Sequence, residues 1–200
     1  MEARSGIRVE KIMIRRAIQF VASLSMLTVL IPVLIIIAVA VKVDSKGPII
    51  FRQRRIGRYG KEFTIYKFRT MYVDTDPIAE SPDSVSDKRI TRAGKICRRF
   101  NLDEFLQLYN ILKGDMAFVG PRPQLKPEMK EMEEKYPELC KKRLLVRPGL
   151  TCPWAILEGY RKTYPSLDML ESDAKYVDEQ SFLLNLKVGL KTFIYLLKGE

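Results

Sequence analysis

The sequence contains no histidine among its 200 residues, and this absence narrows the chemistry open to the protein. Ser-His-Asp triads, histidine-based zinc sites and imidazole acid–base catalysis are all excluded. The three cysteines (Cys97, Cys140 and Cys152) are far apart and form no C-x-x-C pair, so we expect neither structural zinc nor a disulfide framework. Any catalysis must therefore depend on carboxylates, lysine, arginine, tyrosine, cysteine or a metal ion held by oxygen.

Acidic residues are also comparatively few. The chain has 35 Lys and Arg residues against 24 Asp and Glu, which gives a formal net charge of +11. A balance of this sign indicates a polyanionic partner, which can be nucleic acid, anionic lipid or a phosphorylated substrate. A long apolar segment near the start of the chain favours lipid and phosphorylated substrate, so we expect no nucleic-acid partner.

Residues 17–41 contain no charged side chain and form this apolar segment. As a straight helix it would be roughly 37 Å long, against a hydrocarbon core of about 30 Å. Pro32 divides it into arms of roughly 22 and 15 Å, and neither arm crosses a bilayer alone. Cationic residues flank both ends, so no excess of Lys and Arg sets an orientation. A re-entrant helix broken at Pro32 and a kinked spanning helix both remain open.

The rest of the chain is expected to fold as one domain over residues 42–200, after a basic arm at 1–16 and the membrane helix at 17–41. The run PIIFRQRRIGRYGKEFTIYKFRTMYV predicts a β-hairpin whose turn lies at Gly57–Gly60. Period-2 alternation places Lys67 and Arg69 on one face of its second strand. Residues 74–90 are rich in Pro, Ser and Asp and predict a loop.

Helical patterns dominate the sequence beyond this loop. We expect a basic helix in TRAGKICRRF, a helix in NLDEFLQLYNIL, a charged helix over 126–143 and a helix at the C-terminus. The stretches KGDMAFVGPRP and VRPGLTCPW predict turn-rich loops. In the last helix Lys187, Lys191 and Lys198 share a stripe amid apolar residues. This pattern fits a helix in the membrane interface and equally fits a core-facing amphipathic helix.

The adjacent acids Asp103 and Glu104 are the strongest chemical candidates, and they also have a structural interpretation. Asn101 followed three residues later by Glu104 has the spacing of a capping box. The surrounding cations favour a functional interpretation, because they can hold phosphates and keep a carboxylate ionised. A carboxylate in such a place can bind Mg²⁺ or attack phosphorus. The cations are Lys67, Arg69, Arg92, Lys95, Arg98, Arg99, Arg122, Arg143, Arg147 and Arg161.

The runs YKFRTM, LDEFLQLYNILKGDMAFVGPRP and RPGLTCPW resemble the bacterial sugar transferase family, the monotopic phosphoglycosyl transferases. The similarity extends from about Arg15 to the C-terminus, and the small size resembles the minimal catalytic form. The resemblance implies transfer of a phospho-sugar from a UDP-sugar to polyprenyl (undecaprenyl) phosphate, with release of UMP, as the first membrane step of glycoconjugate assembly. It also implies a re-entrant helix that turns at a proline, matching Pro32, and a catalytic domain on the cytoplasmic face of the bacterial inner membrane.

By the same resemblance Asp103 is the nucleophile, which forms an acyl-phosphate that carries the sugar, and Glu104 assists it. Mg²⁺, with Asp103 as its expected ligand, neutralises the diphosphate. The cations that match family positions are Lys67, Arg98, Arg122 and Arg147, and Arg69 is added as a further phosphate-binding candidate. Asp173 matches a family acid whose role the resemblance leaves open, and Arg161 is a weaker match because the spacing after Trp154 departs from the pattern.

The expected fold is therefore mixed α/β and mostly helical: a re-entrant membrane helix, a small β-hairpin, and amphipathic interfacial helices around an active site at the membrane surface. The bacterial inner membrane with its anionic lipids is an expected partner, and a homo-oligomer is left open. A membrane-attached basic binding or scaffold module without catalysis is the alternative, although it leaves the acid pair unexplained. A transferase of the multi-span type is disfavoured by the single apolar segment.

Overall fold

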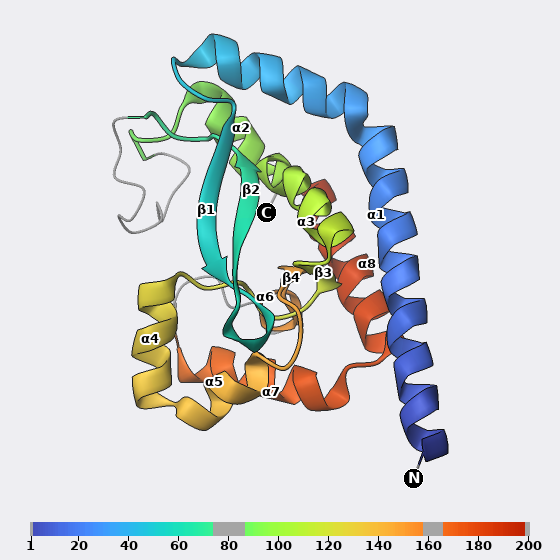
Figure 1. Cartoon of the computed structure of the whole chain (residues 1–200). Helices are drawn as coiled ribbons and strands as arrows, with labels where there is room; N and C mark the ends of the chain where they lie inside the picture. Colours follow the sequence, from blue (N-terminus) through green and yellow to red (C-terminus); the bar gives the residue numbers. More distant parts are fainter. Residues whose placement is uncertain (1, 74–86, 158–165, 199–200) are drawn as a thin grey trace.

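The computed structural model describes residues 2–73, 87–157 and 166–198. Its first element is a 43-residue helix, α1 (Glu2–Asp44), which follows one side of the molecule and then bends over the top of it (Figure 1). The basic arm and the apolar segment, expected as separate units, are thus parts of one continuous helix. Pro32 lies inside it, lacks an amide hydrogen and clashes with a preceding carbonyl, which is a sufficient cause for the bend. The re-entrant path itself stays a prediction.

One face of α1 packs against the domain and the other is bare. Leu27 and Leu30 join a core cluster with Ile111, while Ile37 and Val41 pack in a second cluster. Apolar side chains on the other face are exposed; they include Val29, Ile31, Ile35, Ile36, Val39 and Val43. In the part of the chain that the structure describes, the stretch Met13–Asp44 is the one helix long and apolar enough to cross a membrane.

Polar contacts fasten both arms of α1 to the domain. The guanidinium of Arg16 donates to the carbonyl oxygens of Ile111 and Leu112, at 2.6 and 2.5 Å. These carbonyls end helix α3 (Gln107–Lys113), so Arg16 caps that helix from outside. At the other end of α1, the Asp44 carboxylate accepts a hydrogen bond of 2.8 Å from the amide of Ala93, in the first turn of the next helix. The apolar helix is therefore tied to the segments on either side of the acid pair.

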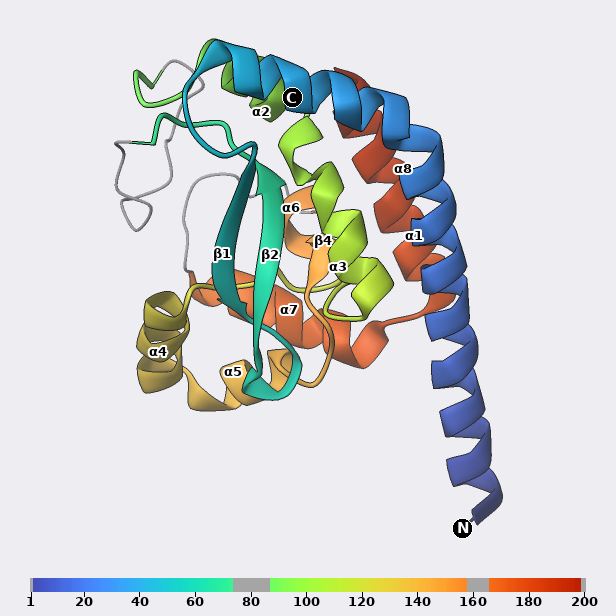
Figure 2. The ribbon, with the colours of Figure 1, turned by 45° about the horizontal axis from the view of Figure 1, so that its top comes forward.

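The predicted β-hairpin is confirmed. Strands β1 (Ile50–Ile56) and β2 (Glu62–Phe68) pair antiparallel from Ile50 opposite Phe68 to Ile56 opposite Glu62. A single 3-10 turn, η1 (Arg58–Gly60), connects them. Asn110 of α3 is fully buried and joins β2, because its side chain donates to the Thr64 carbonyl at 2.7 Å and accepts from the Tyr66 amide. The hairpin and α3 consequently form one unit (Figure 2).

The acid pair lies between two helices. Helix α2 (Arg92–Arg99) is confirmed as predicted and is capped by Thr91, whose hydroxyl accepts from the Gly94 amide. A Cβ on Gly94 would lie 2.1 Å from the Thr70 carbonyl oxygen, so only glycine permits this close approach. A 3-10 segment, η2 (Leu102–Leu106), then leads into α3. The capping-box interpretation of Asn101 is wrong, since Asn101 is left-handed at φ 51° and makes no side-chain cap.

A second small sheet was not predicted. Strands β3 (Ala117–Val119) and β4 (Gly149–Thr151) lie inside the two stretches expected to be loops, and they pair in parallel. Gly149 makes this possible, because a Cβ there would lie 2.1 Å from the Gly120 amide nitrogen. The strands are too short for periodicity to reveal them.

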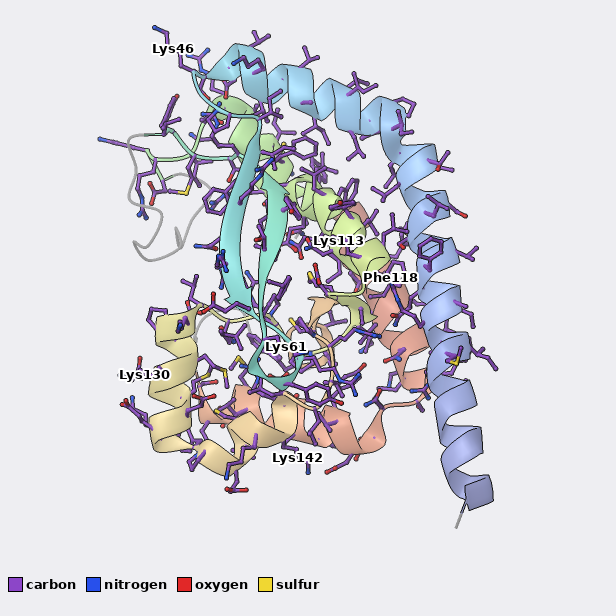
Figure 3. The ribbon with its side chains drawn as sticks, in the orientation of Figure 1. Lys46, Lys61, Lys113, Phe118, Lys130 and Lys142 are labelled. Carbon is purple, nitrogen blue, oxygen red and sulfur yellow. The ribbon has the colours of Figure 1, made fainter. Side chains whose placement is uncertain are left out.

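The remaining helices form a base and one flank of the domain. The charged helix expected over 126–143 is two helices, α4 (Lys126–Lys135) and α5 (Pro137–Arg143), because Pro137 forces the preceding residue out of the helical region. Both turn their lysines outward, as Lys130 and Lys142 show in Figure 3. Helices α6 (Pro153–Leu157), α7 (Leu167–Glu179) and α8 (Phe182–Lys198) complete the described chain.

The predicted C-terminal helix is confirmed as α8. Val188 is fully buried in a core cluster, whereas Phe182, Leu183, Leu190 and Phe193 are exposed. Figures 1 and 2 show α8 on the same flank of the molecule as α1. Placement of α8 at a membrane interface stays a prediction. The fold is thus mostly helical with a small hairpin, as expected.

Candidate functional site

The centre of the site is a carboxylate pair facing a lysine. Asp103 and Glu104 lie in the short η2 segment, and Asp103 is only 8% exposed. Lys67, near the end of β2, places its Nζ 2.6 Å from the Glu104 Oε1, and each of these two side chains is 19% exposed. The buried side chain of Gln107, one turn beyond Glu104, also donates a hydrogen bond to that carboxylate. Glu104 is thereby held on two sides.

The two acids differ in their proton affinity. Burial raises the pKa of Asp103 to about 6 and the neighbouring Glu104 charge adds to this, although Lys67 and Arg98 oppose it. Burial also raises the pKa of Glu104, but Lys67 and Arg122, together with the hydrogen bonds from Lys67 and Gln107, outweigh it and the net shift is downward. Near neutral pH Glu104 is therefore a firmly ionised partner for lysine. Asp103 is mostly ionised and is the more basic of the two carboxylates.

Two hollows that open to solvent, of about 310 and 240 Å³, share the loop that carries Arg122, and the larger one adjoins this group. The larger is lined by Lys67, Glu104, Gln107, Arg122 and Cys152 among others. It therefore combines three cations (Arg55, Lys67 and Arg122), one carboxylate and a buried amide with an apolar floor from β2 and β4. Asp103 precedes Glu104 directly and stands beside this hollow rather than in its lining. Such convergence of polar groups is typical of a ligand site.

Two predicted cations join the acids. Arg98 is half-buried, donates from Nε to the Thr70 hydroxyl at 2.9 Å and interacts electrostatically with Asp103. Burial lowers the pKa of Arg98, although a guanidinium remains charged. Arg122 lies in the loop after β3, lines the same hollow as Glu104 and acts on it electrostatically. With Lys67, these three cations face the acid pair, as a site for phosphate groups requires.

The structure places the other predicted cations elsewhere. Arg69 lies just beyond the end of β2, and its guanidinium donates to the carbonyls of Ser45 and Pro48 at 2.9 and 2.6 Å, which fixes the end of α1. Arg147 lies near Arg16 and Arg58 rather than near the acids, and burial lowers its pKa. Phosphate binding by Arg69 and Arg147 stays a prediction. Arg161 lies outside the described residues.

Asp173 forms a buried ion pair that the sequence did not reveal. Its Oδ2 lies 2.9 Å from Nη2 of Arg143, and the two side chains are 1% and 3% exposed. The partners come from α7 and α5, and no local spacing connects them.

Sequence reasoning also did not find Gln107 and Cys152. For Gln107 a signal was available, because it follows Glu104 by three residues, which is helical spacing.

The donor atoms are compatible with magnesium bound together with a substrate. Among the described residues, the structure contains no group of three or more Asp, Glu, Cys or His side chains that could hold a metal alone. Mg²⁺ commonly takes only one or two protein carboxylates and fills its other positions with phosphate oxygens and water. Asp103, mostly ionised and next to a second carboxylate, fits that requirement.

Comparison with known proteins agrees with this chemistry. A family model described as bacterial sugar transferase matches residues 10–199. An Aeromonas hydrophila UDP-N-acetylgalactosamine-undecaprenyl-phosphate N-acetylgalactosaminephosphotransferase is 32% identical over 93% of this chain and 44% of its own length. The Escherichia coli UDP-glucose:undecaprenyl-phosphate glucose-1-phosphate transferase is 36% identical over 94% of this chain and 40% of its own.

A relative of similar size is also known. The exopolysaccharide production protein PSS of Rhizobium leguminosarum is 36% identical over 92% of this chain and 94% of its own length. The chain otherwise spans less than half of several curated relatives that it matches. The family model covers nearly the whole sequence, and so the chain belongs to the bacterial sugar transferase family.

Proposed function

We propose that this protein transfers a sugar phosphate from a UDP-sugar to undecaprenyl phosphate and releases UMP. The observation that carries the proposal is the buried Asp103, with a pKa raised to about 6, beside the Lys67–Glu104 pair. Such a carboxylate is ionised at neutral pH yet poorly solvated, which favours its action as a nucleophile. The names of relatives, which specify undecaprenyl-phosphate phosphotransferases, support the same reaction.

In the first half-reaction a carboxylate oxygen of Asp103 attacks the phosphorus that bears the sugar. The bond between that phosphorus and the bridging oxygen breaks, UMP leaves with the oxygen, and an aspartyl phospho-sugar remains. Lys67, Arg98 and Arg122 are positioned to bind the phosphate oxygens and to stabilise charge in the transition state. Glu104 orients the Lys67 side chain through the contact of 2.6 Å between the two groups.

In the second half-reaction an oxygen of the lipid phosphate attacks the same phosphorus. The acyl-phosphate bond breaks, the Asp103 carboxylate is regenerated, and the lipid diphosphate sugar is the product. Asp103 would hold Mg²⁺, which would supply charge neutralisation on the donor diphosphate in the first half-reaction. Covalent catalysis divides the transfer so that the soluble donor and the lipid acceptor need not be bound together.

A membrane location is supported by the exposed apolar face of α1, and the bend at Pro32 supports re-entry from one side. In this arrangement the exposed apolar residues of α8 lie in the same interface as those of α1. We place the catalytic domain on the cytoplasmic face, where nucleotide sugars are available. The lipid phosphate would then reach Asp103 from the bilayer surface, close to the end of α1 that Asp44 and Arg69 fix.

The experiment is an incubation of the full chain, in lipid nanodiscs, with a panel of UDP-sugars and Mg²⁺ but without lipid acceptor. We expect stoichiometric UMP release and a mass increase of one phospho-sugar, which peptide mapping assigns to Asp103. Asp178→Asn is the matched control, because Asp178 is an exposed carboxylate paired with Lys142. The mechanism would be contradicted if the Asp103→Asn variant formed no adduct and still transferred the sugar phosphate to the acceptor at the wild-type rate. A complete lack of UMP release across donors would instead favour a binding module.

A further inference from the structure

The loop that carries Arg122 is held by two arginines on two successive carbonyl groups. Nη2 of Arg143 donates to the carbonyl oxygen of Arg122 at 2.9 Å. Nη1 of Arg55, in β1, donates to the carbonyl oxygen of Pro123 at 3.2 Å. The next carbonyl, that of Gln124, accepts from the Ile56 amide at 2.9 Å. Three consecutive carbonyls are thus fixed, two of them by guanidinium groups.

Each of the two guanidiniums is accompanied by a carboxylate. Arg143 is paired with Asp173 at 2.9 Å in the core, and Arg55 lies 3.6 Å from a Glu128 oxygen with its side chain 14% exposed. Gln53 further orients Arg55 through two contacts to one amide oxygen, at 2.7 and 3.1 Å. The charges of the clamp are therefore balanced locally. Arg55 and Arg122 both line the hollow, and Arg122 is the one that acts electrostatically on Glu104.

The Arg143–Asp173 pair is not explained by stability alone. Two charges at 3% and 1% exposure lose hydration that their mutual attraction only partly restores. Apolar side chains of similar volume often serve as well in such a place. Arg143 also donates a hydrogen bond to the Arg122 carbonyl oxygen, and an apolar residue could not make this bond. That bond requires a donor at this site, and the donor's charge requires Asp173.

The loop that carries Arg122 borders a solvent-open hollow on each of two sides. A second hollow, of about 240 Å³, lies behind the loop and is lined by Arg122, Arg143, Leu144 and Pro148 among others. Arg122 therefore stands between two hollows, and its backbone position decides how far its side chain reaches toward Lys67 and Glu104. Displacement of a catalytic cation by about 1 Å can lower a rate by roughly 10²-fold.

We propose that Arg143, neutralised by Asp173, is a positioning residue, which with Arg55 fixes the loop so that Arg122 meets the donor diphosphate. The inference rests on the proposed transferase function. It also assigns a role to Asp173, which acts through Arg143 and the loop backbone and touches no reacting atom.

The test is the double variant Arg143→Met/Asp173→Leu, which removes both charges and keeps apolar volume. We expect a folded protein with a melting temperature close to that of the wild type and a kcat about 10²-fold lower. The KM for the UDP-sugar should rise less than kcat falls, because a misplaced cation costs most where charge develops. Arg143→Lys keeps the pair with Asp173 but loses the two-pronged donor, and we expect it to fold and to lose about tenfold in kcat.

The matched control is Lys142→Met/Asp178→Leu, which removes an exposed ion pair joining the same two helices. We expect its kcat to stay at the wild-type value. A cycle with Arg122→Ala separates positioning from general damage, since loss of the clamp should add little once Arg122 is gone. Wild-type kcat in both Arg143 variants, or a loss that adds fully to that of Arg122→Ala, would overturn the inference. Failure of the proposed function is separate, because the wild type itself would then release no UMP.

Discussion

Two cation–carboxylate pairs of this protein have similar geometry and opposite surroundings. Lys67 and Glu104 lie 2.6 Å apart and are each 19% exposed, whereas Arg143 and Asp173 lie 2.9 Å apart at 3% and 1% exposure. Both join segments that are distant in the sequence. The first pair faces a hollow and has a further carboxylate, Asp103, beside it. The second pair is shielded from solvent between helices α5 and α7.

The difference shows how burial decides what an ion pair can do. In the closed pair each charge is committed to a protein partner, so the pair can only hold other groups in place. In the open pair the lysine lines a hollow that a ligand can enter, and the attraction of Lys67 and Arg98 does not offset the burial of the additional acid, Asp103. Burial accordingly raises the pKa of Asp103 to about 6. A carboxylate whose ionised form is destabilised in this way is expected at a reactive site.

Removal of the additional acid should have the largest effect on activity. Asp103→Asn eliminates the nucleophile, and we expect the transfer rate to fall by on the order of 10⁴-fold, because no other carboxylate occupies its place. The measurement is UMP release coupled to formation of the lipid product, in nanodiscs with undecaprenyl phosphate. Asp178→Asn, at the surface of α7, should retain the wild-type rate. A rate reduced less than tenfold in Asp103→Asn would remove this residue from the chemistry.

Breaking the closed pair should give the largest loss of stability. Arg143→Met leaves Asp173 buried without its cation, and we expect the free energy of unfolding to fall by about 3–5 kcal/mol. Denaturant unfolding in detergent micelles, at pH 7.5, measures this. Adding Asp173→Leu to that variant should recover most of the loss, since two apolar groups then replace two charges. Equal stability of the single variant and the wild type would mean that water reaches Asp173.

Breaking the open pair should act on catalysis far more than on stability. Lys67→Met removes a cation from the proposed phosphate site, and we expect kcat to fall about 10²-fold. Its effect on the melting temperature should be small, because the Glu104 carboxylate can regain water through the hollow. Lys126→Met is the control, since Lys126 is an exposed lysine paired with Glu62. A melting temperature that falls in Lys67→Met as far as in Arg143→Met would erase the distinction between the two pairs.

Local patterns in the sequence are sufficient to predict the open site and the elements that surround it. The hairpin, α2 and the C-terminal helix are predictable because periodicity and turn residues act over short distances. The acid pair is found through its motif and its cationic context. Even here strand alternation fails where the strand ends. It places Arg69 on the same face as Lys67, but β2 ends at Phe68, and the Arg69 side chain contacts the segment that follows α1. The division of the charged helix does have a local signal, which is Pro137.

The closed pair could not be predicted in the same way. Arg143 and Asp173 meet only because α5 and α7 pack together, and each residue alone resembles a helix-surface charge. The parallel pairing of β3 and β4 has the same origin, since it joins two three-residue strands separated by two helices. Contacts of this kind arise from tertiary packing, which a single sequence does not express as periodicity. The carboxylate pair was therefore accessible to sequence reasoning, and the device that positions Arg122 was not.

The smallest expected effect is a gain in stability when the Asp103 carboxylate is removed. It is the most specific to the open site, because removal of a charge from the closed pair should lower stability instead. The folded pKa of Asp103, about 6, lies above its ordinary value of 3.8, so the folded protein binds a proton that the unfolded chain has released. Stability from this group is complete below pH 4 and is lost as the pH rises through 6. Asp103→Asn should therefore be more stable than the wild type by about 1–3 kcal/mol at pH 7.5 without ligands, and equal to it near pH 4. Parallel unfolding curves at the two pH values measure this difference. An inactive variant that is also less stable at pH 7.5 would show that the Asp103 carboxylate is satisfied by its neighbours, which would place it with the closed pair.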